Sequence, residues 1–301
     1  MYKCNVCETE LASLAECETA TVRSNVRRFR EESFGVWRCA ACGSIHAKEA
    51  VDLDHYYADY PLARGDIDAV LHPGYASFER RLVKAGFEKR HAILDFGCGS
   101  GSLVRYLERC GYANVVGYDG YASKFRDPSL LLRRYDCIVS QDVIEHVDDP
   151  LELLQKFDRL VQPGGRIVIG TPDADAINLS RPGDFIHALH APYHRHILSA
   201  RALRESAQRL GWRLDSYHSR RFGSTLMPGQ NARYGQFYLK CFDDTLDLVA
   251  EPIRFDHWRL WTPKAFFLAC FGYFLDPRTD VMFAFRSPER GALPAWKEQS
   301  V

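Results

Sequence analysis

The sequence lacks the features that mark a strongly charged, disordered or membrane-embedded chain. Lys plus Arg and Asp plus Glu each total 39 in 301 residues, so the formal net charge is zero and no overall field attracts nucleic acid or an anionic membrane. Apolar residues make up 46% and charged residues 26%, which excludes a disordered or collagen-like chain. The longest strongly apolar run, Ala265 to Leu275, is too short to span a bilayer. We therefore expect no membrane partner.

The first residues of the sequence do not show the pattern of a secretory leader. The first ten residues contain neither a basic segment nor an apolar run, so we expect a cytoplasmic protein whose cysteines stay reduced. Most of the 10 cysteines lie singly in apolar sequence, where a small buried side chain is the simplest interpretation. The others form two pairs with the spacing Cys-x-x-Cys, namely Cys4 with Cys7 and Cys39 with Cys42.

These two pairs predict a structural zinc site. Each Cys-x-x-Cys turn aims two thiolates at one point, and two such turns supply the closed tetrahedral shell of structural zinc. Short strand patterns at residues 21–23 and 34–38 indicate a zinc ribbon, which we place at residues 1–50. Because four ligands leave no open position, this zinc should hold structure and not catalyse. The alternative is two unrelated turns with reduced thiols; neither pair has the helix-start position of a redox motif.

A glycine-rich turn in the middle of the chain predicts a ligand site. A buried strand ends at Asp95, the glycine turn follows at residues 97–101, and helical spacing begins at Leu103. Such a turn lets a ligand approach backbone N–H groups at a helix N-terminus. Its pattern is Gly-x-Gly-x-Gly, with Ser102 where the dinucleotide fingerprint has its third glycine. A second strand ends at Asp119, about 20 residues further on, where a carboxylate can bind both hydroxyls of a ribose.

Strand and helix patterns alternate beyond the turn. Residues 135–142 read as a third strand, 151–161 as an amphipathic helix and 166–172 as another buried strand, which predicts an α/β fold with a parallel doubly wound sheet. The aromatic stretch 223–277 interrupts the alternation. We interpret it as a cap over an acceptor pocket, with a homodimer surface as the alternative. Residues 279–286 form the last strand, which we expect to be antiparallel.

At this point the chain resembles the class I S-adenosylmethionine-dependent methyltransferases. Within that class it resembles the branch that includes the ubiquinone-biosynthesis O-methyltransferases, and a zinc ribbon in front is similar to zinc-containing sugar C-methyltransferases. The resemblance covers roughly residues 90–220 and implies a Rossmann-like sheet and S-adenosylmethionine as cofactor. The neutral charge, the aromatic insertion and the histidine-rich segment favour a small-molecule acceptor methylated on O, C or N. The resemblance is carried by four motifs in order, which are Leu94–Gly101, Val116–Asp119, Tyr135–Pro150 and Pro163–Pro172.

The resemblance also implies a domain organisation. We expect a zinc ribbon at residues 1–50, a linker and helix over the cofactor at 51–90, the cofactor-binding Rossmann-like domain at 91–222, the cap insertion at 223–277, and the last strand with a tail at 278–301.

Carried onto this sequence, the family's cofactor contacts fall at the ends of the first three strands and on one tyrosine ahead of them. The chain departs from most of the class in one place, because residues 120–135 are too few for both a helix and a strand, so the usual polar contact to the adenine has no position there. The predicted cofactor-binding residues are Tyr57, Asp95, Gly97, Cys98, Gly99, Gly101, Tyr118, Asp119, Gly120 and Gln141.

Methyl transfer depends mainly on alignment of donor and acceptor, and a neutral hydroxyl or an acidic C–H also needs a base. His146 is the first candidate base, and Asp142, four residues before it at a strand end, is predicted to be catalytic with it. His146 resembles the histidine that acts with a tyrosine in phosphoethanolamine methyltransferases. The alternative is that the Glu-His-Val segment only caps or packs a helix.

A second group of candidates is the histidine-rich segment 187–196. We include His190, His194 and His196 as candidate bases, and favour a base or acceptor-binding role over a metal because no carboxylate or thiol lies between them in the sequence and Arg195 would repel a cation. The alternative is that His194 and His196 only shape the entry to the helix that follows Ser199.

Two other functions stay open. A zinc-ribbon RNA methyltransferase would use the arginines of residues 23–30 and Arg220-Arg221 to grip nucleic acid. Glu31 and Glu32 follow the first group, so we favour a self-compensated loop and expect no nucleic-acid partner. A non-catalytic, cofactor-binding interaction module is the third hypothesis.

Overall fold

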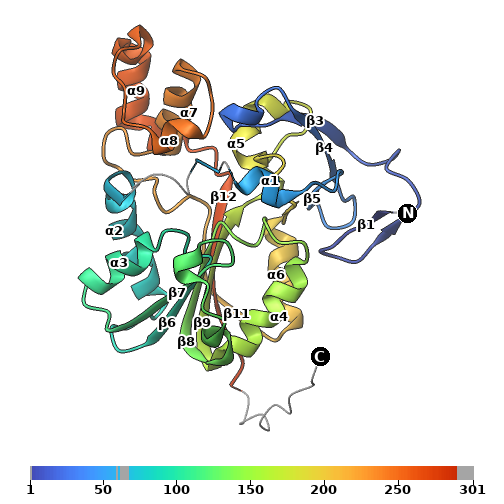
Figure 1. The fold of residues 1–301 in the computed structure, drawn as a ribbon, viewed down its shortest axis with the longest axis vertical. Coiled ribbons are helices and arrows are strands. Elements are labelled where there is room, and N and C mark those ends of the chain that lie inside the picture. The colour runs from blue at the N-terminus through green and yellow to red at the C-terminus, as the bar shows by residue number, and fades with distance from the viewer. Residues whose placement is uncertain (1, 59, 62–67, 290–301) are drawn as a thin grey trace.

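The computed structural model describes residues 2–58, 60–61 and 68–289; the predicted tail from residue 290 lies outside them. A six-stranded sheet in the order β11-β12-β9-β8-β6-β7 forms the centre of the fold (Figure 1). Four strands are parallel, and β12 is antiparallel to both of its neighbours, as predicted. The strands are β6 (Ala92–Phe96), β7 (Asn114–Tyr118), β8 (Tyr135–Gln141), β9 (Val161–Pro172), β11 (Arg213–His218) and β12 (Asp280–Arg286).

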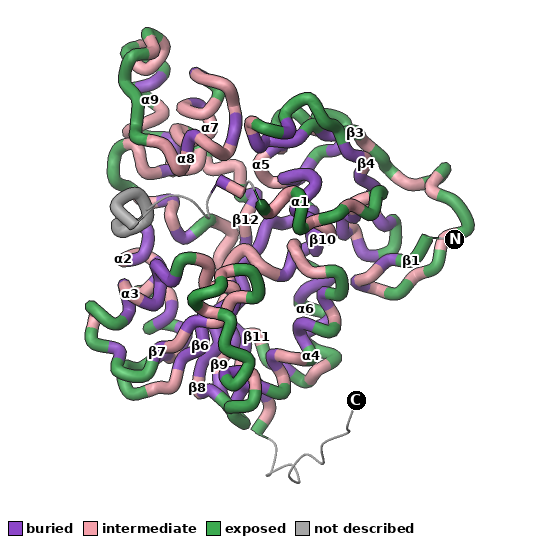
Figure 2. Tube along the Cα trace, viewed as in Figure 1, coloured by how far each residue is buried: buried purple, intermediate pink, exposed green. Residues whose placement is uncertain are grey.

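Helices cover both faces of this sheet, which confirms the predicted Rossmann-like α/β architecture. On one face α2 (Asp68–Lys84) and α3 (Ser102–Arg109) pack against apolar side chains of β6 and β8. On the other face lie α4 (Pro150–Leu160) and α6 (Ala200–Arg209). Because both faces are covered, the central strands are buried along most of their length, and Figure 2 shows them mainly in purple.

The sheet ends at β7 because the chain between β7 and β8 is short. Only two 3-10 turns, η3 (Ser123–Phe125) and η4 (Pro128–Leu132), occupy this stretch. The helix and strand that most of the class has there are missing from this segment, in agreement with its length.

The N-terminal region carries a second sheet, in the order β10-β5-β4-β3. Its strands β3 (Thr19–Arg23), β4 (Ser33–Arg38) and β5 (Ile45–Ala47) lie within the predicted ribbon, and a small hairpin joins β1 (Tyr2–Lys3) to β2 (Glu10–Leu11). The edge strand β10 (His196–Ile197) comes from the histidine-rich segment instead. The sheet of the N-terminal region is thus completed by chain that follows the central strands.

Residues 223–277 form a helical layer at the top of Figure 1. It contains α7 (Ala232–Cys241), α8 (Asp247–Ala250), η7 (Trp258–Trp261), α9 (Pro263–Phe271) and η8 (Gly272–Leu275). Asn231 caps α7 and donates to backbone carbonyls of α9, which ties the two helices together. Many of its aromatic side chains are exposed. Within the described residues no helix is both long and apolar enough to cross a bilayer.

Candidate functional site

The four paired cysteines lie together and form what we call the cysteine cluster. Cys4 Sγ is 3.6 Å from Cys42 Sγ, Cys7 Sγ is 3.7 Å from Cys39 Sγ, and all four sulfur atoms lie within 4.8 Å of one another. Thiolates held at about 2.3 Å around one zinc ion would be about 3.8 Å apart. The thiols therefore fit the predicted zinc ion as a closed set of ligands.

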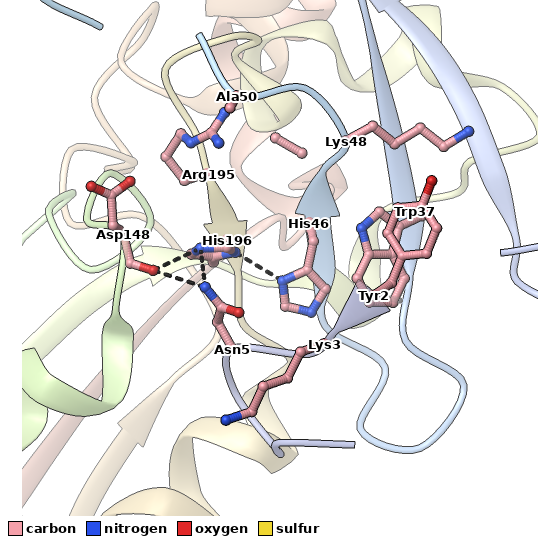
Figure 3. A pocket seen from close by; sticks show the side chains of 11 residues that line it. Tyr2, Lys3, Asn5, Trp37, His46, Lys48, Ala50, Asp148, Arg195 and His196 are labelled. Atoms are coloured by element: carbon pink, nitrogen blue, oxygen red, sulfur yellow. Dashed lines mark hydrogen bonds between the residues drawn. The ribbon is translucent and has the colours of Figure 1, made fainter. Parts of the chain in front are cut away.

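A chain of hydrogen bonds links the cysteine cluster to the loop after β8. His46 Nε2 lies 3.2 Å from Cys4 Sγ, and His46 Nδ1 lies 2.9 Å from His196 Nδ1. His196 Nε2 is 3.0 Å from the carbonyl oxygen of Asp148, which also accepts from Asn5 (Figure 3). These groups line an open pocket of about 240 Å³. His196, a predicted catalytic residue, thus lies beside the cysteine cluster and supports its surroundings.

The glycine turn is held to the end of β7 by backbone and carboxylate hydrogen bonds. The N–H groups of Gly97 and Cys98 donate to the carbonyl oxygen of Tyr118. Asp119 Oδ2 accepts from the N–H of Gly99 at 2.9 Å. Asp119 Oδ1 accepts from the backbone N–H groups of Tyr121 and Ala122. Asp119 therefore fixes the turn against its own strand end. Its Oδ1 already accepts two hydrogen bonds, and its Oδ2 keeps one lone pair for a ligand.

The space beside this turn fits a positively charged ligand. The Asp95 carboxylate is buried and has no hydrogen-bond donor among the described residues. Burial and the neighbouring Asp119 raise the pKa of Asp95 to about 7. A buried carboxylate that is repelled by a second, partly exposed carboxylate would be stabilised by a cation. Side chains added at Gly99 or Gly120 would meet open space, so a ligand has room to approach the backbone there.

Other predicted cofactor residues have side chains that pack within the protein. Cys98 Sγ lies under the turn against Gly117, and the Tyr118 ring packs against Phe96 with centroids 5.3 Å apart. Gln141 lies over Gly170 and donates to the neighbouring Asp142.

Two of the predicted glycines are required by close contacts. Gly97 and Gly101 both have positive φ, and a Cβ would be 2.2 Å from Val143 at the first and 2.3 Å from Phe125 at the second. The turn sequence therefore needs glycine at both positions.

Tyr57, at the end of α1 (Leu53–Tyr57), joins the turn to the predicted base. Its hydroxyl lies 2.9 Å from His146 Nδ1, and its ring stacks on Tyr121 with centroids 4.6 Å apart. Burial lowers the pKa of His146 to about 4, although Asp142 opposes this shift, so the imidazole is neutral at pH 7. Burial also raises the pKa of Tyr57 well above its ordinary value, so its hydroxyl stays protonated and donates to His146.

His146 contacts two further predicted bases, and we call His146, His190 and His194 the histidine cluster. The ring centroids of His146 and His194 are 4.7 Å apart, and His190 lies 6.1 Å and 5.0 Å from these two rings. Burial lowers the pKa of both His190 and His194 well below the usual value. Three neutral imidazoles therefore face one another at the carboxyl edge of the sheet, where open α/β folds bind ligands.

Glu145 lies against this cluster and was not singled out from the sequence. It is fully buried, its Oε2 accepts from Thr171, and its Oε1 lies 3.9 Å from His194 Nε2. Burial and Asp142 raise its pKa well above the ordinary value. The ligand atoms of Glu145, His146 and His194 lie within 4.8 Å of one another, a set that can hold a divalent cation. The fold thus brings Glu145 to the histidine-rich segment, which has no carboxylate of its own between its histidines. Metal binding by this group is therefore an alternative to a role of the histidines as bases.

Two of the arginines invoked for RNA binding, Arg27 and Arg221, are paired with carboxylates. Arg221 donates to Asp142 at 2.9 Å and lies 3.7 Å from Asp280. Arg27 binds Asp243 and Glu251 of the cap insertion. The charge of these arginines is therefore compensated within the fold, in the first case at the edge of the candidate site.

Comparison with known proteins agrees with this geometry. Residues 72–217 match the family model described as "Methyltransferase domain". These residues form a class I S-adenosylmethionine-dependent methyltransferase domain.

Curated relatives and a solved structure resemble the domain at low identity. The ubiquinone biosynthesis O-methyltransferase of Cereibacter sphaeroides is 33% identical over 126 residues, which are 35% of this chain and 51% of that protein. The tRNA U34 carboxymethyltransferase of Idiomarina loihiensis is 27% identical over 40% of this chain and 45% of its own length. This chain thus spans about half the length of these relatives. A methyltransferase structure from Archaeoglobus fulgidus has a TM-score of 0.45 at 16% identity, covering 78% and 100% of the two chains.

Proposed function

We propose that this protein transfers the methyl group of S-adenosylmethionine to a small-molecule acceptor through an oxygen, nitrogen or acidic carbon. The observation that carries the proposal is the position of Tyr57, which touches both halves of the site. Its hydroxyl bonds to His146, and its ring stacks on Tyr121, whose N–H binds Asp119. The carboxylates of the cofactor turn and the neutral imidazoles of the histidine cluster are thereby brought to one edge of the sheet.

The turn residues suit the cofactor. Asp119 would hold the ribose hydroxyls, Asp95 would face the positively charged methionine half, and Gly99 and Gly120 would let the ligand approach the backbone. When bound, the cofactor supplies an already activated methyl group, so the protein has mainly to align the acceptor and remove its proton.

The histidine cluster suits an acceptor that loses a proton. Its imidazoles are neutral at pH 7, and the acceptor would give its proton to one of them as it attacks the methyl carbon. Aromatic rings surround the cluster, including Tyr57, Tyr60 and Tyr193, and exclude water from the transferred proton.

Nothing in the chain's relatives selects the acceptor, because one relative is named for a quinone precursor and another for a tRNA base. The internal pairing of Arg27 and Arg221 favours the small molecule. We also propose that the cysteine cluster binds a zinc ion with a structural role.

The test is transfer of a labelled methyl group from S-adenosylmethionine into two fractions of a cell extract, small metabolites and RNA. We expect label in a small metabolite, which mass spectrometry then identifies, and none with Asp119→Ala. Label in RNA alone would replace this function with the RNA methyltransferase. Cofactor binding without transfer to either fraction would favour the non-catalytic module.

A further inference from the structure

Asn25 reaches the histidine cluster from a distant part of the sequence. It lies between the two cysteine pairs in the sequence, two residues after β3 ends at Arg23, and is fully buried. Its backbone carbonyl accepts from Leu246 of the cap insertion. Its side-chain Oδ1 lies 2.5 Å from His190 Nδ1, and its Nδ2 lies 3.0 Å from His187 Nδ1.

These contacts determine which nitrogen of His190 carries hydrogen. A carbonyl oxygen only accepts, so Nδ1 of His190 must be the donor to Asn25 Oδ1. The amide orientation is fixed from its other end, because Nδ2 donates to His187 Nδ1 and His187 Nε2 in turn donates to Asp244 at 2.9 Å. Each hydrogen bond of this chain then has one donor and one acceptor, and one hydrogen on each imidazole suffices.

His190 Nε2 then keeps an unshared lone pair. This atom is buried and has no hydrogen-bond partner among the described residues. The other cluster histidines face polar partners. His146 Nδ1 bonds to Tyr57, whereas His194 Nδ1 lies 2.8 Å from the carbonyl of Ala188 and His194 Nε2 faces Glu145 Oε1 at 3.9 Å.

The backbone and the aromatic neighbours hold this ring in place. His190 has a φ of +35°, an uncommon conformation for a residue other than glycine, at the end of α5 (Ile186–Leu189). Its ring stacks on Tyr193 with centroids 4.6 Å apart and lies 5.8 Å from Tyr60. A strained backbone, a stacked face and a single hydrogen bond at Nδ1 together leave Nε2 as the free atom of the ring.

We propose that Asn25 is a positioning residue that holds His190 with its proton on Nδ1, so that His190 Nε2 accepts the proton of the acceptor during methyl transfer. This inference rests on the proposed function and names the base among the candidate histidines. The acceptor loses its O–H, N–H or C–H proton to Nε2 and forms its bond to the methyl carbon with the freed electron pair. The electron pair of the broken S–C bond stays on sulfur, and the positive charge passes to the imidazole.

The N-terminal region then has a second task besides binding zinc. The segment between its cysteine pairs delivers Asn25 to the site, and the hydrogen bond from Leu246 to Asn25 connects it to the cap insertion. The acceptor class that fits is one that brings an O–H, N–H or acidic C–H to a buried lone pair.

The test is nitrogen-15 NMR of the histidine rings in the full chain, with His190 assigned by the signals lost in His190→Gln. We expect the wild-type chain to carry the His190 proton on Nδ1 and none on Nε2. A proton on Nε2 would overturn the proposal whether or not the chain transfers methyl groups. If the wild-type chain methylates nothing, the proposed function fails, and this spectrum still decides the position of the proton.

Turnover of Asn25 variants supplies the second measurement. Asn25→Leu should mix the two tautomers and lower kcat by about tenfold to a hundredfold, which reaches the lower limit of the contribution of general base catalysis because part of the population keeps the productive tautomer. Cofactor affinity should change by less than about twofold. Asn25→Asp keeps an acceptor for Nδ1–H and should recover most of the rate. Asn114→Leu is the matched control at an exposed position. Equal losses of turnover and cofactor affinity, or no recovery by Asp, would show a merely structural role.

Discussion

The glycine turn and the histidine cluster are built in opposite ways. The turn is one continuous segment that bonds to the end of the next strand, at Tyr118 and Asp119. The cluster draws on chain after β8, on the histidine-rich segment, on Tyr57 ahead of the sheet and on Asn25 from the N-terminal region. A local site is determined by residues that are neighbours in the sequence, whereas a site assembled from four segments depends on how the whole chain folds.

The same contrast predicts which substitutions should affect distant parts of the site. The cysteine cluster holds the region that delivers Asn25, and its hydrogen bonds through His46 reach the loop that carries His146. A change at the cysteine cluster should therefore affect the histidine cluster as well, whereas a change at the turn should stay local.

The largest effect is expected from Cys39→Ser. Zinc binding contributes on the order of 10 kcal/mol to the folding of small zinc domains, so we expect loss of zinc and of cooperative unfolding in the N-terminal region. Metal analysis and thermal unfolding measure this. Cys17→Ser is the matched control, because Cys17 is half-buried and lies outside the cluster.

Two results would contradict the comparison. Full zinc content in Cys39→Ser would remove the cysteine cluster as a zinc site. If Glu145→Gln lost metal while the cysteine cluster stayed intact, a second ion would bind at the histidine cluster. The residues of that cluster would then act as metal ligands and not as bases.

The second effect concerns the turn alone. Asp119→Ala removes the acceptor for the ribose and the bonds to Gly99, Tyr121 and Ala122, so cofactor affinity should fall tenfold or more, an estimate of about 1.5–3 kcal/mol for a charged hydrogen bond. Calorimetry measures the affinity. Asp127→Ala, at an exposed aspartate that caps η4, is the control. Unchanged affinity in Asp119→Ala would refute the assignment of this carboxylate to the cofactor.

The sequence sufficed for the turn because its chemistry is local. The glycine pattern and the distance to Asp119 are visible in the spacing, whereas the cofactor role of Asp95 comes from the family resemblance. The segment 120–135 was predicted to be too short for both a helix and a strand, and it holds only two 3-10 turns. The four cysteines were identified for the same reason. Their two turns each carry their own geometry, whatever folds between them.

The histidine cluster could be predicted only in part. Its histidines stood out by number, but nothing local separates His196, which turns to His46, from His190 and His194. Glu145 lies within a family motif and did not stand out from its neighbours. Asn25 belongs to no sequence motif, because its role comes from the packing of β3 beside α5. Arg221 looked like part of a basic patch, although the fold pairs it with Asp142.

The third effect is a pH dependence of cofactor binding. The pKa of Asp95 is raised to about 7 by burial and by Asp119, so the carboxyl is increasingly protonated as the pH falls below 7. A cationic ligand favours the ionised form, so affinity should rise with pH up to about 7 and then level off, by at most about tenfold per pH unit below 7. Titration calorimetry between pH 5.5 and about 8.5 measures this. Asp95→Asn should bind more weakly at pH 8 and without this dependence; an identical pH profile in the variant would assign the effect to another group.

The smallest effect is expected at Tyr57, where the two halves meet. Tyr57→Phe removes the hydrogen bond to His146, which is worth about 0.5–1.5 kcal/mol, but keeps the ring on Tyr121. We expect turnover to fall about threefold to tenfold with unchanged cofactor affinity. Tyr57→Ala should weaken cofactor binding as well, because the ring stacks on Tyr121, whose N–H donates to Asp119. Steady-state kinetics and calorimetry separate the two, with Tyr217→Phe as the exposed control. Normal turnover in Tyr57→Phe would mean that the hydroxyl does not serve His146, and the two halves would then be joined by ring packing alone.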